Sequence, residues 1–315
     1  MVDKPFRIVF FGTPDFAVPT LRALLAGPDS VVGVVCQPDK PAGRGQRLAV
    51  PPVKQLALEA GVPIFQPEKL RVPEAIAALT AWAPDLIVVA AYGKILPKSI
   101  LDLPRLGCIN VHGSILPKYR GAAPIQWAIL RGEERTGVTI MRMNERMDAG
   151  DILLVAETDI GADETYGVLR TRLAELGAPA LCEAVARLHA GTLVGQPQRE
   201  EDMTLAPMIK KEDGRVDWRQ PAMTLARMVR AFNPWPSAFT HLGTQQLKIH
   251  RAHADARTVN APPGTVASLS AGVHVATGEG TLVLDEVQLE GRKRLPAAEF
   301  ARGSIKVGVV LGGVP

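Results

Sequence analysis

The stretch NVHGSILPKYRG, residues 110–121, brings an amide, an imidazole and a hydroxyl together directly after a short apolar run. An asparagine amide can donate a hydrogen bond to an oxygen that gains negative charge during a reaction. A histidine can donate a hydrogen bond or move a proton near neutral pH. Asn110 and His112 are therefore candidates for a catalytic site that stabilises an oxyanion and handles a proton.

A β-strand would let these two residues act together. If residues 108–112 form a strand that ends at the rim of a sheet, the two-residue period places Asn110 and His112 on the same side. Val111 then turns away into packing. Two ordinary polar residues at a strand end would show the same pattern, so the assignment needs a third group.

Two aspartates downstream offer that third group. The sequence MDAGDI, residues 147–152, contains Asp148 and Asp151 on either side of a glycine. An aspartate next to a histidine orients the imidazole and can accept or relay a proton. Asp148 could reach the same cleft, and Asp151 could equally cap the next element or belong to an ordinary turn. Spacing alone does not choose between them.

The elements that must hold these residues alternate between two patterns. Short apolar and β-branched runs predict strands over residues 7–11, 31–36, 86–90, 108–111 and 138–143. Helical patterns lie between them at residues 16–25, 53–60, 73–81 and 125–130. Apolar strands separated by helices predict an α/β domain with a doubly wound, mostly parallel sheet, whose function belongs at the carboxyl ends of the strands. A long helical pattern over residues 165–188 contains Gly177 and Pro179, which predict a kink or a break.

The C-terminal part follows a different pattern. One amphipathic helix over residues 221–232 precedes short strands with turn signals, at residues 239–241, 246–253, 264–269, 272–277, 281–287 and 304–310. Such strands favour a small β-barrel, and an oligonucleotide-binding (OB-like) barrel is a plausible member of that class. We therefore expect a catalytic domain over residues 1–190, a linker over residues 191–207, and a C-terminal barrel domain over residues 208–315.

Composition limits the class of protein. The chain has 315 residues, of which 47% are hydrophobic, enough for two domains with a core each. The sequence contains no apolar run of membrane-spanning length and no signal segment, so a cytoplasmic protein without membrane contact is expected. Three widely spaced cysteines predict buried thiols and neither a disulfide framework nor a zinc site.

Positive charge gathers in the C-terminal third. Residues 205–315 contain 14 Lys and Arg against 9 Asp and Glu, whereas residues 1–204 contain 22 against 23. A basic module beside a neutral one suggests a polyanionic partner, although a solvated surface often carries such an excess.

The stretch NVHGSILPKYRG, followed by MDAGD, resembles the formyltransferases that take a one-carbon unit from 10-formyltetrahydrofolate, because residue types, order and spacing agree. The resemblance implies a catalytic triad of Asn110, His112 and Asp148, and it implies no metal. It also implies that the folate co-substrate is bound with the help of Ser114, Ile115, Leu116 and Pro117. Isoleucine stands at position 115 where leucine is usual, a volume-conserving change.

A basic stretch indicates which kind of formyltransferase the sequence resembles. QPDKPAGRGQRLAVPPVK, residues 37–54, resembles the loop that methionyl-tRNA formyltransferases insert into the acceptor arm of the tRNA. RAFNPWPSAF, residues 230–239, resembles the start of their C-terminal barrel domain. Guanidinium groups suit phosphate recognition. The implied tRNA-binding residues are Lys40, Arg44, Arg47 and Lys54.

The resemblance implies a reaction. The α-amine of methionine on initiator tRNA attacks the formyl carbon of 10-formyltetrahydrofolate, with Asn110 stabilising the oxyanion, His112 handling the proton and Asp148 orienting His112. The implied enzyme serves translation initiation and works as a monomer. A formyltransferase for an amino-sugar nucleotide or for glycinamide ribonucleotide shares the chemistry and stays open. The non-enzymatic alternative is an RNA-binding protein with an inert α/β scaffold.

Overall fold

The chain forms two compact units. The computed structural model describes residues 4–42, 47–270 and 272–313. The first unit consists of Met1–Pro124, Arg135–Asp159 and Arg170–Pro207, and the second of Ile125–Glu134, Ile160–Leu169 and Met208–Pro315.

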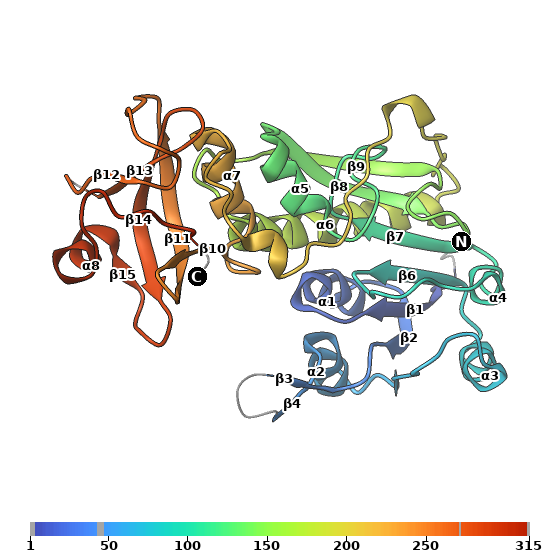
Figure 1. Ribbon diagram of the computed structural model, residues 1–315. Coiled ribbons are helices and arrows are strands. Elements are labelled where there is room, and N and C mark those ends of the chain that lie inside the picture. The colour runs from blue at the N-terminus through green and yellow to red at the C-terminus, as the bar shows by residue number, and fades with distance from the viewer. Residues whose placement is uncertain (1–3, 43–46, 271, 314–315) are drawn as a thin grey trace. The chain divides into compact units, whose positions relative to one another are not determined.

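The first unit is built on a seven-stranded sheet with the strand order β5-β2-β1-β6-β7-β8-β9 (Figure 1). The strands from β5 to β7 run parallel, and β8 and β9 add an antiparallel edge. The bounds are β1 (Arg7–Gly12), β2 (Ser30–Val35), β5 (Ile64–Phe65), β6 (Leu86–Ala90), β7 (Cys108–His112), β8 (Arg135–Arg142) and β9 (Ile152–Asp159). The expected mostly parallel, doubly wound sheet is confirmed.

Helices connect these strands. They are η1 (Asp15–Ala17), α1 (Val18–Ala26), α2 (Pro52–Glu59), α3 (Pro73–Ala81), α4 (Lys98–Leu101), α5 (Pro124–Arg131) and α6 (Tyr166–His189). A separate antiparallel hairpin consists of β3 (Lys40–Ala42) and β4 (Arg47–Ala49), between β2 and α2.

Gly177 and Pro179 predicted a kink or a break, and helix α6 is continuous through both residues, so no break occurs there. The reason is close packing on the sheet. A Cβ atom at position 177 would lie 3.0 Å from Cγ1 of Val111 on β7 and 3.5 Å from Cγ1 of Val138 on β8. The glycine therefore lets the helix approach the sheet, and this tertiary packing outweighs the low helix propensity of both residues.

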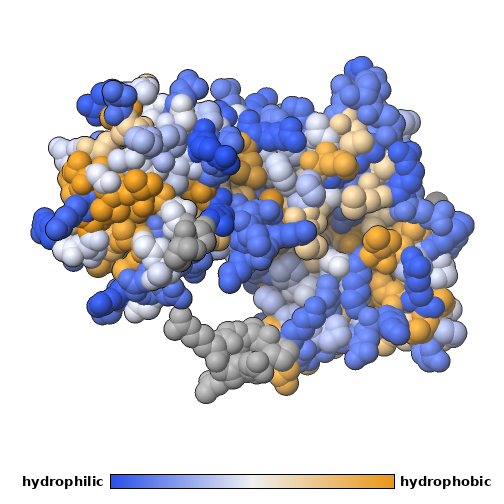
Figure 2. Space-filling view, in the orientation of Figure 1, coloured by the Kyte–Doolittle hydropathy of each residue, from blue (hydrophilic) through white to orange (hydrophobic). Residues whose placement is uncertain are grey.

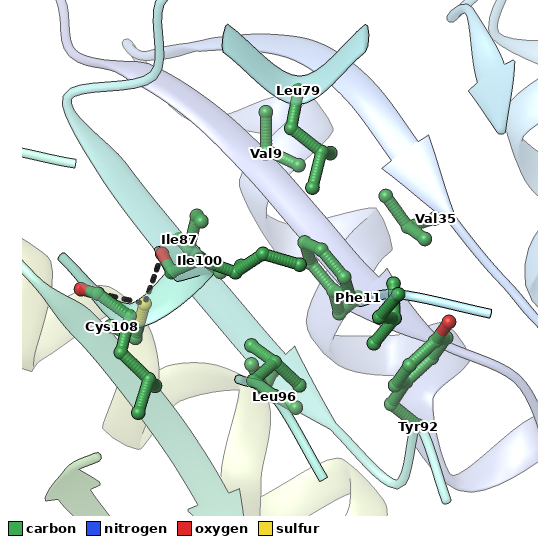
Figure 3. Packing of buried hydrophobic residues seen from close by; sticks show 12 residues of the cluster. Val9, Phe11, Val35, Leu79, Ile87, Tyr92, Leu96, Ile100 and Cys108 are labelled. Atoms are coloured by element: carbon green, nitrogen blue, oxygen red, sulfur yellow. Dashed lines mark hydrogen bonds between the residues drawn. The ribbon is translucent and has the colours of Figure 1, made fainter. Parts of the chain in front are cut away.

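The opposite face of the sheet carries a core cluster drawn from alternate residues of neighbouring strands (Figure 3). Val9 and Phe11 of β1, Ile87 and Val89 of β6 and Cys108 of β7 all belong to it. The cluster also includes Val35, Leu70, Leu79, Tyr92, Leu96, Ile100 and Leu101. Asn110 and His112 follow Cys108 on β7 at steps of two residues. Because side chains alternate along a strand, they lie on the same side of the sheet as this cluster.

Two of the three cysteines are buried, as predicted. The Cys108 thiol donates weak hydrogen bonds to the carbonyls of Ile100 and Leu101, and burial raises its pKa to about 12. Burial also raises the pKa of Cys36 to about 11. The prediction is wrong for Cys182, which lies exposed on α6.

The second unit contains a curled antiparallel sheet in the order β10-β11-β14-β13-β12, with β15 paired to β14. It forms a half-barrel, consistent with the small OB-like domain that was expected. Its elements are α7 (Ala222–Ala231), β10 (Ala238–Leu242), β11 (Gln245–Asp255), β12 (Val266–Ser268), β13 (Val273–Ala276), β14 (Thr281–Leu289), β15 (Leu295–Pro296) and α8 (Ala297–Ser304), with η3 (Glu212–Gly214) before them.

The strand predicted over residues 304–310 is not formed. Helix α8 ends at Ser304, and the following segment makes a single bridge between Val310 and Thr265. Ile305 and Leu311 are buried, and the N–H of Leu311 donates to the carbonyl of Gly264, whereas Val307 and Val310 are exposed.

The surface seen in Figure 2 is mainly hydrophilic, with hydrophobic residues in separate patches. Two exposed hydrophobic side chains of the first unit, Met147 and Leu205, are 59% and 55% exposed. Across the described ranges, no helix combines the length and apolar character needed to cross a membrane.

Candidate active site

Strand β7 carries Asn110 and His112 at its carboxyl end, between the parallel strand β6 and the antiparallel strand β8. Val111 faces α6, as the contact at Gly177 shows, so the two polar residues lie on the other side of the sheet. His112 is buried and Asn110 is half-buried. Within the described part of the chain, the Asn110 amide makes no side-chain hydrogen bond, which leaves it available to a ligand.

The His112 ring is fixed through Nε2, which lies 3.0 Å from the carbonyl oxygen of Tyr119. A carbonyl can only accept a hydrogen bond, so Nε2 carries a proton and donates it. Nδ1 is then the ring nitrogen that can exchange a proton. It lies 3.7 Å from Oδ2 of Asp148, an ion-pair distance that is too long for a direct hydrogen bond.

Of the two aspartates that spacing left open, Asp148 is the one that lies next to His112. Asp148 reaches His112, whereas the Asp151 side chain lies against Gly195, where an added Cβ would come within 2.9 Å of the Asp151 Cβ. The Asp148 carboxylate also accepts a hydrogen bond from the N–H of Gly121 at 2.9 Å. Its side chain is 18% exposed, so the carboxylate stays accessible from one side.

The loop that holds Asp148 has an unusual backbone. Asp148 has a φ of 49°, in the left-handed region that costs most residues roughly 1–2 kcal/mol. Two positions later, a Cβ atom at Gly150 would lie 1.8 Å from the carbonyl oxygen of Arg142, so only glycine fits. Residues at sparsely populated angles cluster at functional sites, where the surrounding structure must hold them.

The stretch with the expected folate contacts forms a hydrogen-bonded loop after β7. The Ser114 hydroxyl donates to the carbonyl of Lys118 at 2.7 Å, and the N–H of Leu116 donates to the Thr139 hydroxyl at 3.1 Å. Ser114 and Leu116 are buried and shape the loop. Ile115 and Pro117 are half-buried, so they retain surface for a ligand.

The basic residues expected to bind tRNA have different surroundings. Lys54 lies on α2 and forms an ion pair with Asp39 at 2.7 Å. Lys40 begins β3, and its ammonium donates to the side-chain oxygen of Gln37 at 3.2 Å. Arg47 begins β4, and Arg44 lies outside the described residues.

Asp39 is held from two sides. Hydrogen bonds from Gln66 and then from Lys54 keep the pKa of the Asp39 carboxyl below its usual range. The Lys54 charge is therefore already paired with a carboxylate within the protein, so it is less available to bind a phosphate.

Three residues near the site were missed by the sequence analysis. Gln198 donates to the carbonyls of Asp148 and Gly150, Arg120 donates to Gln198, and Thr204 accepts from the N–H of Tyr119. Arg120 belongs to the stretch quoted first, but Gln198 and Thr204 lie in the predicted linker, where no periodicity or motif marks them. Residues 191–207 are hydrogen-bonded to the first unit, including a bridge from Gln196 to Ile152.

Metal ligation finds no support in the ranges that the structure covers, because no three His, Cys, Asp or Glu side chains there are grouped to hold an ion. The polar groups of the site are the His112 imidazole beside the Asp148 carboxylate, and the Asn110 amide on the same side of β7 as His112. Together they can stabilise charge on an oxygen and move a proton.

Several methionyl-tRNA formyltransferases are similar to this chain over nearly its whole length. A methionyl-tRNA formyltransferase from Desulfotalea psychrophila is 52% identical over 97% of this chain and 95% of its own length. A protein of the same name from Myxococcus xanthus is 52% identical over 94% of this chain and 95% of its own. Another from Pseudomonas syringae pv. tomato is 49% identical over 99% and 100% of the two chains.

Solved structures share the fold at lower identity. WlaRD, a sugar 3N-formyl transferase, superposes with a TM-score of 0.67 at 15% identity, over 92% of this chain and 100% of that one. HypX from Aquifex aeolicus, in complex with tetrahydrofolic acid, gives a TM-score of 0.60 at 20% identity, over 95% of this chain and 48% of that one. At these identities the likeness shows the fold alone.

Family models cover both units. The model described as "Formyl transferase" matches residues 6–185, and the model described as "Formyl transferase, C-terminal domain" matches residues 208–304. The matched parts include the strand that carries Asn110 and His112 and the loop that carries Asp148. The chain belongs to the formyl transferase family.

Proposed function

We propose that this protein transfers the formyl group of 10-formyltetrahydrofolate to the α-amine of methionine on initiator methionyl-tRNA, for translation initiation. The observation that carries the proposal is the His112–Asp148 pair, with Asn110 on the same side of β7, in a chain about half identical, over nearly its full length, to methionyl-tRNA formyltransferases. The family membership supports the reaction class, and the names of these relatives support the substrates.

The site fits a formyl group. The half-buried Asn110 amide has no hydrogen-bond partner among the described residues and lies on the same side of β7 as His112. A carbonyl oxygen there would meet an unused donor. As the amine attacks the formyl carbon, negative charge grows on that oxygen, and a donor already in place stabilises it without reorganisation.

His112 and Asp148 handle the proton in this proposal. Attack by an amine leaves an extra proton on nitrogen, and the departing folate nitrogen needs one. Nδ1 of His112 is the ring atom that can exchange a proton, since Nε2 donates to the Tyr119 carbonyl. The Asp148 carboxylate beside Nδ1 stabilises the ring when it carries both protons and assists the proton transfer.

The folate co-substrate is assigned to the loop after β7. Ile115 and Pro117 retain accessible apolar surface, and the hydrogen bonds of Ser114 and Leu116 hold the loop in one shape. The co-substrate supplies the activated one-carbon unit. The loop supplies orientation, which alone can contribute several kcal/mol to lowering a barrier.

Initiator tRNA is the second substrate in this proposal. Residues 1–190 carry catalysis, residues 208–315 bind tRNA, and the positive excess of the C-terminal third supplies attraction for the phosphates. Lys40, Arg44 and Arg47 are assigned to the acceptor arm, with a smaller role for Lys54 because Asp39 pairs it. We further propose that the chain acts as a monomer in the cytoplasm, where charged tRNA is used.

Formyltransferases for an amino-sugar nucleotide or glycinamide ribonucleotide are not favoured. Proteins with such names or descriptions share only the fold with this chain, whereas the relatives near 50% identity are named for methionyl-tRNA.

The deciding experiment offers four acceptors under the same conditions. The protein is incubated with 10-formyltetrahydrofolate and charged initiator tRNA, charged elongator tRNA, a dTDP-amino sugar or glycinamide ribonucleotide. We expect formyl-methionine on initiator tRNA at the highest kcat/KM. Faster formylation of either small amine would overturn the substrate assignment, and no transfer to any acceptor would overturn the activity.

A further inference from the structure

Residues 198–206 contact Asp148 directly and reach His112 through Tyr119, whose carbonyl binds the imidazole. Gln198 holds the backbone of the Asp148 loop, and Thr204 holds the backbone of the residue that fixes His112. We propose that Gln198 and Thr204 are positioning residues for the formyl transfer, which together set the distance between His112 and Asp148. The inference rests on the proposed function for its catalytic readout, but its structural readout does not.

Both ends of the Gln198 side-chain amide form hydrogen bonds. Its amide nitrogen donates one hydrogen bond to the carbonyl of Asp148 at 2.8 Å and one to the carbonyl of Gly150 at 2.7 Å. Its side-chain oxygen accepts from Nε of Arg120 at 3.0 Å. The Gln198 amide therefore binds two backbone carbonyls of the Asp148 loop, in which Asp148 itself has a φ of 49°. A residue at such an angle persists only where its surroundings impose it.

Arg120 fixes the orientation of that amide. The Arg120 side chain is almost fully buried and lies 3.2 Å from the carboxylate of Glu200, which also pairs with Arg146 at 3.1 Å. A flipped Gln198 amide would face Arg120 with its NH2 group and the two loop carbonyls with its oxygen. Both contacts would then be repulsive, so only one orientation is stable.

Thr204 acts on the histidine side. Its hydroxyl accepts a hydrogen bond from the N–H of Tyr119 at 2.9 Å, and the carbonyl of the same Tyr119 receives the Nε2 proton of His112 at 3.0 Å. Tyr119 also has a positive φ, of 65°. Backbone bonds from Arg120 to Thr204 and from Ala206 to Arg120 keep the two segments in register.

The first test compares two glutamines in the same segment. Gln198→Met keeps the length of the side chain and removes its hydrogen bonds, and Gln196→Met is the control because the Gln196 side chain is exposed and without a hydrogen bond in the described structure. We expect Gln198→Met to lower kcat by about 10- to 100-fold, since a small misplacement of reacting groups can cost that much. The KM values should stay within about twofold, because neither residue contacts substrate in this proposal. Gln196→Met should match wild type.

The second test uses a nearly isosteric pair. Thr204→Val removes the hydroxyl that accepts from Tyr119, and Thr204→Ser retains it. Thr204→Val should lower kcat by about tenfold, and Thr204→Ser should keep most of the activity. This pair also decides the question if Gln198→Met fails to fold.

The third readout is independent of formyl transfer. The Gly121 N–H donates to the Asp148 carboxylate, so its hydrogen exchange reports where that carboxylate sits. In Gln198→Met this amide should exchange at least about tenfold faster, while core amides such as that of Val88 keep wild-type rates. Wild-type kcat and wild-type Gly121 exchange in Gln198→Met would overturn the inference, as would equal kcat values for Thr204→Val and Thr204→Ser. If the wild-type protein transfers no formyl group, only the proposed function is overturned. The hydrogen exchange of the Gly121 amide would still decide whether Gln198 positions Asp148.

Discussion

Oδ2 of Asp148 lies 3.7 Å from Nδ1 of His112, although His112 ends strand β7 and Asp148 lies in the loop between β8 and β9. The distance allows electrostatic attraction without a direct hydrogen bond. Because Nε2 of His112 donates to a carbonyl, Nδ1, next to the carboxylate, is the ring nitrogen left to exchange a proton in the proposed reaction. In the proposed reaction, the pair takes up a proton from one reactant and returns it to another.

Loss of this pair should be strongly non-additive. We expect His112→Ala and Asp148→Ala each to lower kcat by about 10²–10³-fold, and the double variant to be little worse than the more damaged single variant, because residues that act as a unit do not contribute independently. The measurement is kcat/KM for all three variants with charged initiator tRNA. Rate losses that multiply in the double variant would show that the two residues act separately.

Asn110 should contribute through its donor. Asn110→Ala, and the similarly sized Asn110→Asp, should each lower kcat by about 10²–10³-fold, the usual cost of removing one oxyanion donor. The fold should be retained, as the amide makes no side-chain hydrogen bond in the described structure. Asn260→Ala, at an exposed position of the second unit, is the control. Near-wild-type turnover in Asn110→Asp would exclude the oxyanion role.

The left-handed Asp148 loop makes Gly150 a sensitive position. Gly150→Ala would push a Cβ atom against the Arg142 carbonyl, which belongs to the backbone and must shift. We expect a loss of about 1–3 kcal/mol in the free energy of unfolding, together with a lower kcat because Asp148 moves with the loop. Gly303→Ala is the matched control, since a Cβ there meets open space. Denaturant unfolding measures both, and equal stability of the two variants would contradict the prediction.

Much of the scaffold follows from local pattern. The strands β6 and β7 could be predicted because unbroken apolar runs between helices have few other solutions in an α/β fold. The shared side of Asn110 and His112 followed from the two-residue period alone. Each of these inferences needs only residues that are close in sequence.

The rest of the site depends on contacts between distant segments. The choice of Asp148 over Asp151 is made by the Gly121 N–H and by the fit of Gly195 against Asp151, neither of which spacing reveals. Gln198 lies in a stretch without periodicity, so nothing local distinguishes it from a solvent-exposed glutamine. Of the kink or break predicted in α6, the break does not occur for the same reason, because packing on the sheet keeps that helix continuous at Gly177.

The Asp39–Lys54 pair should make stability depend on acid pH. Hydrogen bonds from Gln66 and Lys54 lower the pKa of Asp39 in the folded state. A lowered pKa adds stability above the unfolded pKa of about 3.9, and that stability is lost as the pH falls through the folded pKa. The Tm difference between wild type and Asp39→Asn should therefore be present at pH 7 and shrink below about pH 4. A difference that stays constant from pH 7 to pH 2 would mean that the carboxylate charge is not responsible.

Arg44 and Lys54 should respond differently to loss of charge, although both belong to the same basic stretch. Arg44 lies between two glycines in the sequence and is proposed to contact tRNA phosphate, whereas Lys54 is paired with Asp39. Each phosphate contact adds about 0.9 to the slope of log affinity against log salt on duplex. Arg44→Ala should therefore lower kcat/KM for charged initiator tRNA and flatten its salt dependence, while binding of a folate analogue stays unchanged.

Two further variants separate charge from geometry. Arg44→Lys should recover only part of the loss, because an ammonium keeps the charge but not the planar fork of donors. Lys54→Met should leave the salt slope close to that of wild type, since the ammonium it removes is already neutralised by Asp39 at 2.7 Å. The measurement is kcat/KM over a salt series for wild type, Arg44→Ala, Arg44→Lys and Lys54→Met. If Arg44→Ala follows wild type at every salt concentration while Lys54→Met flattens the slope, the phosphate contact belongs to the helix α2 lysine, and the assignment of Arg44 to the acceptor arm is wrong.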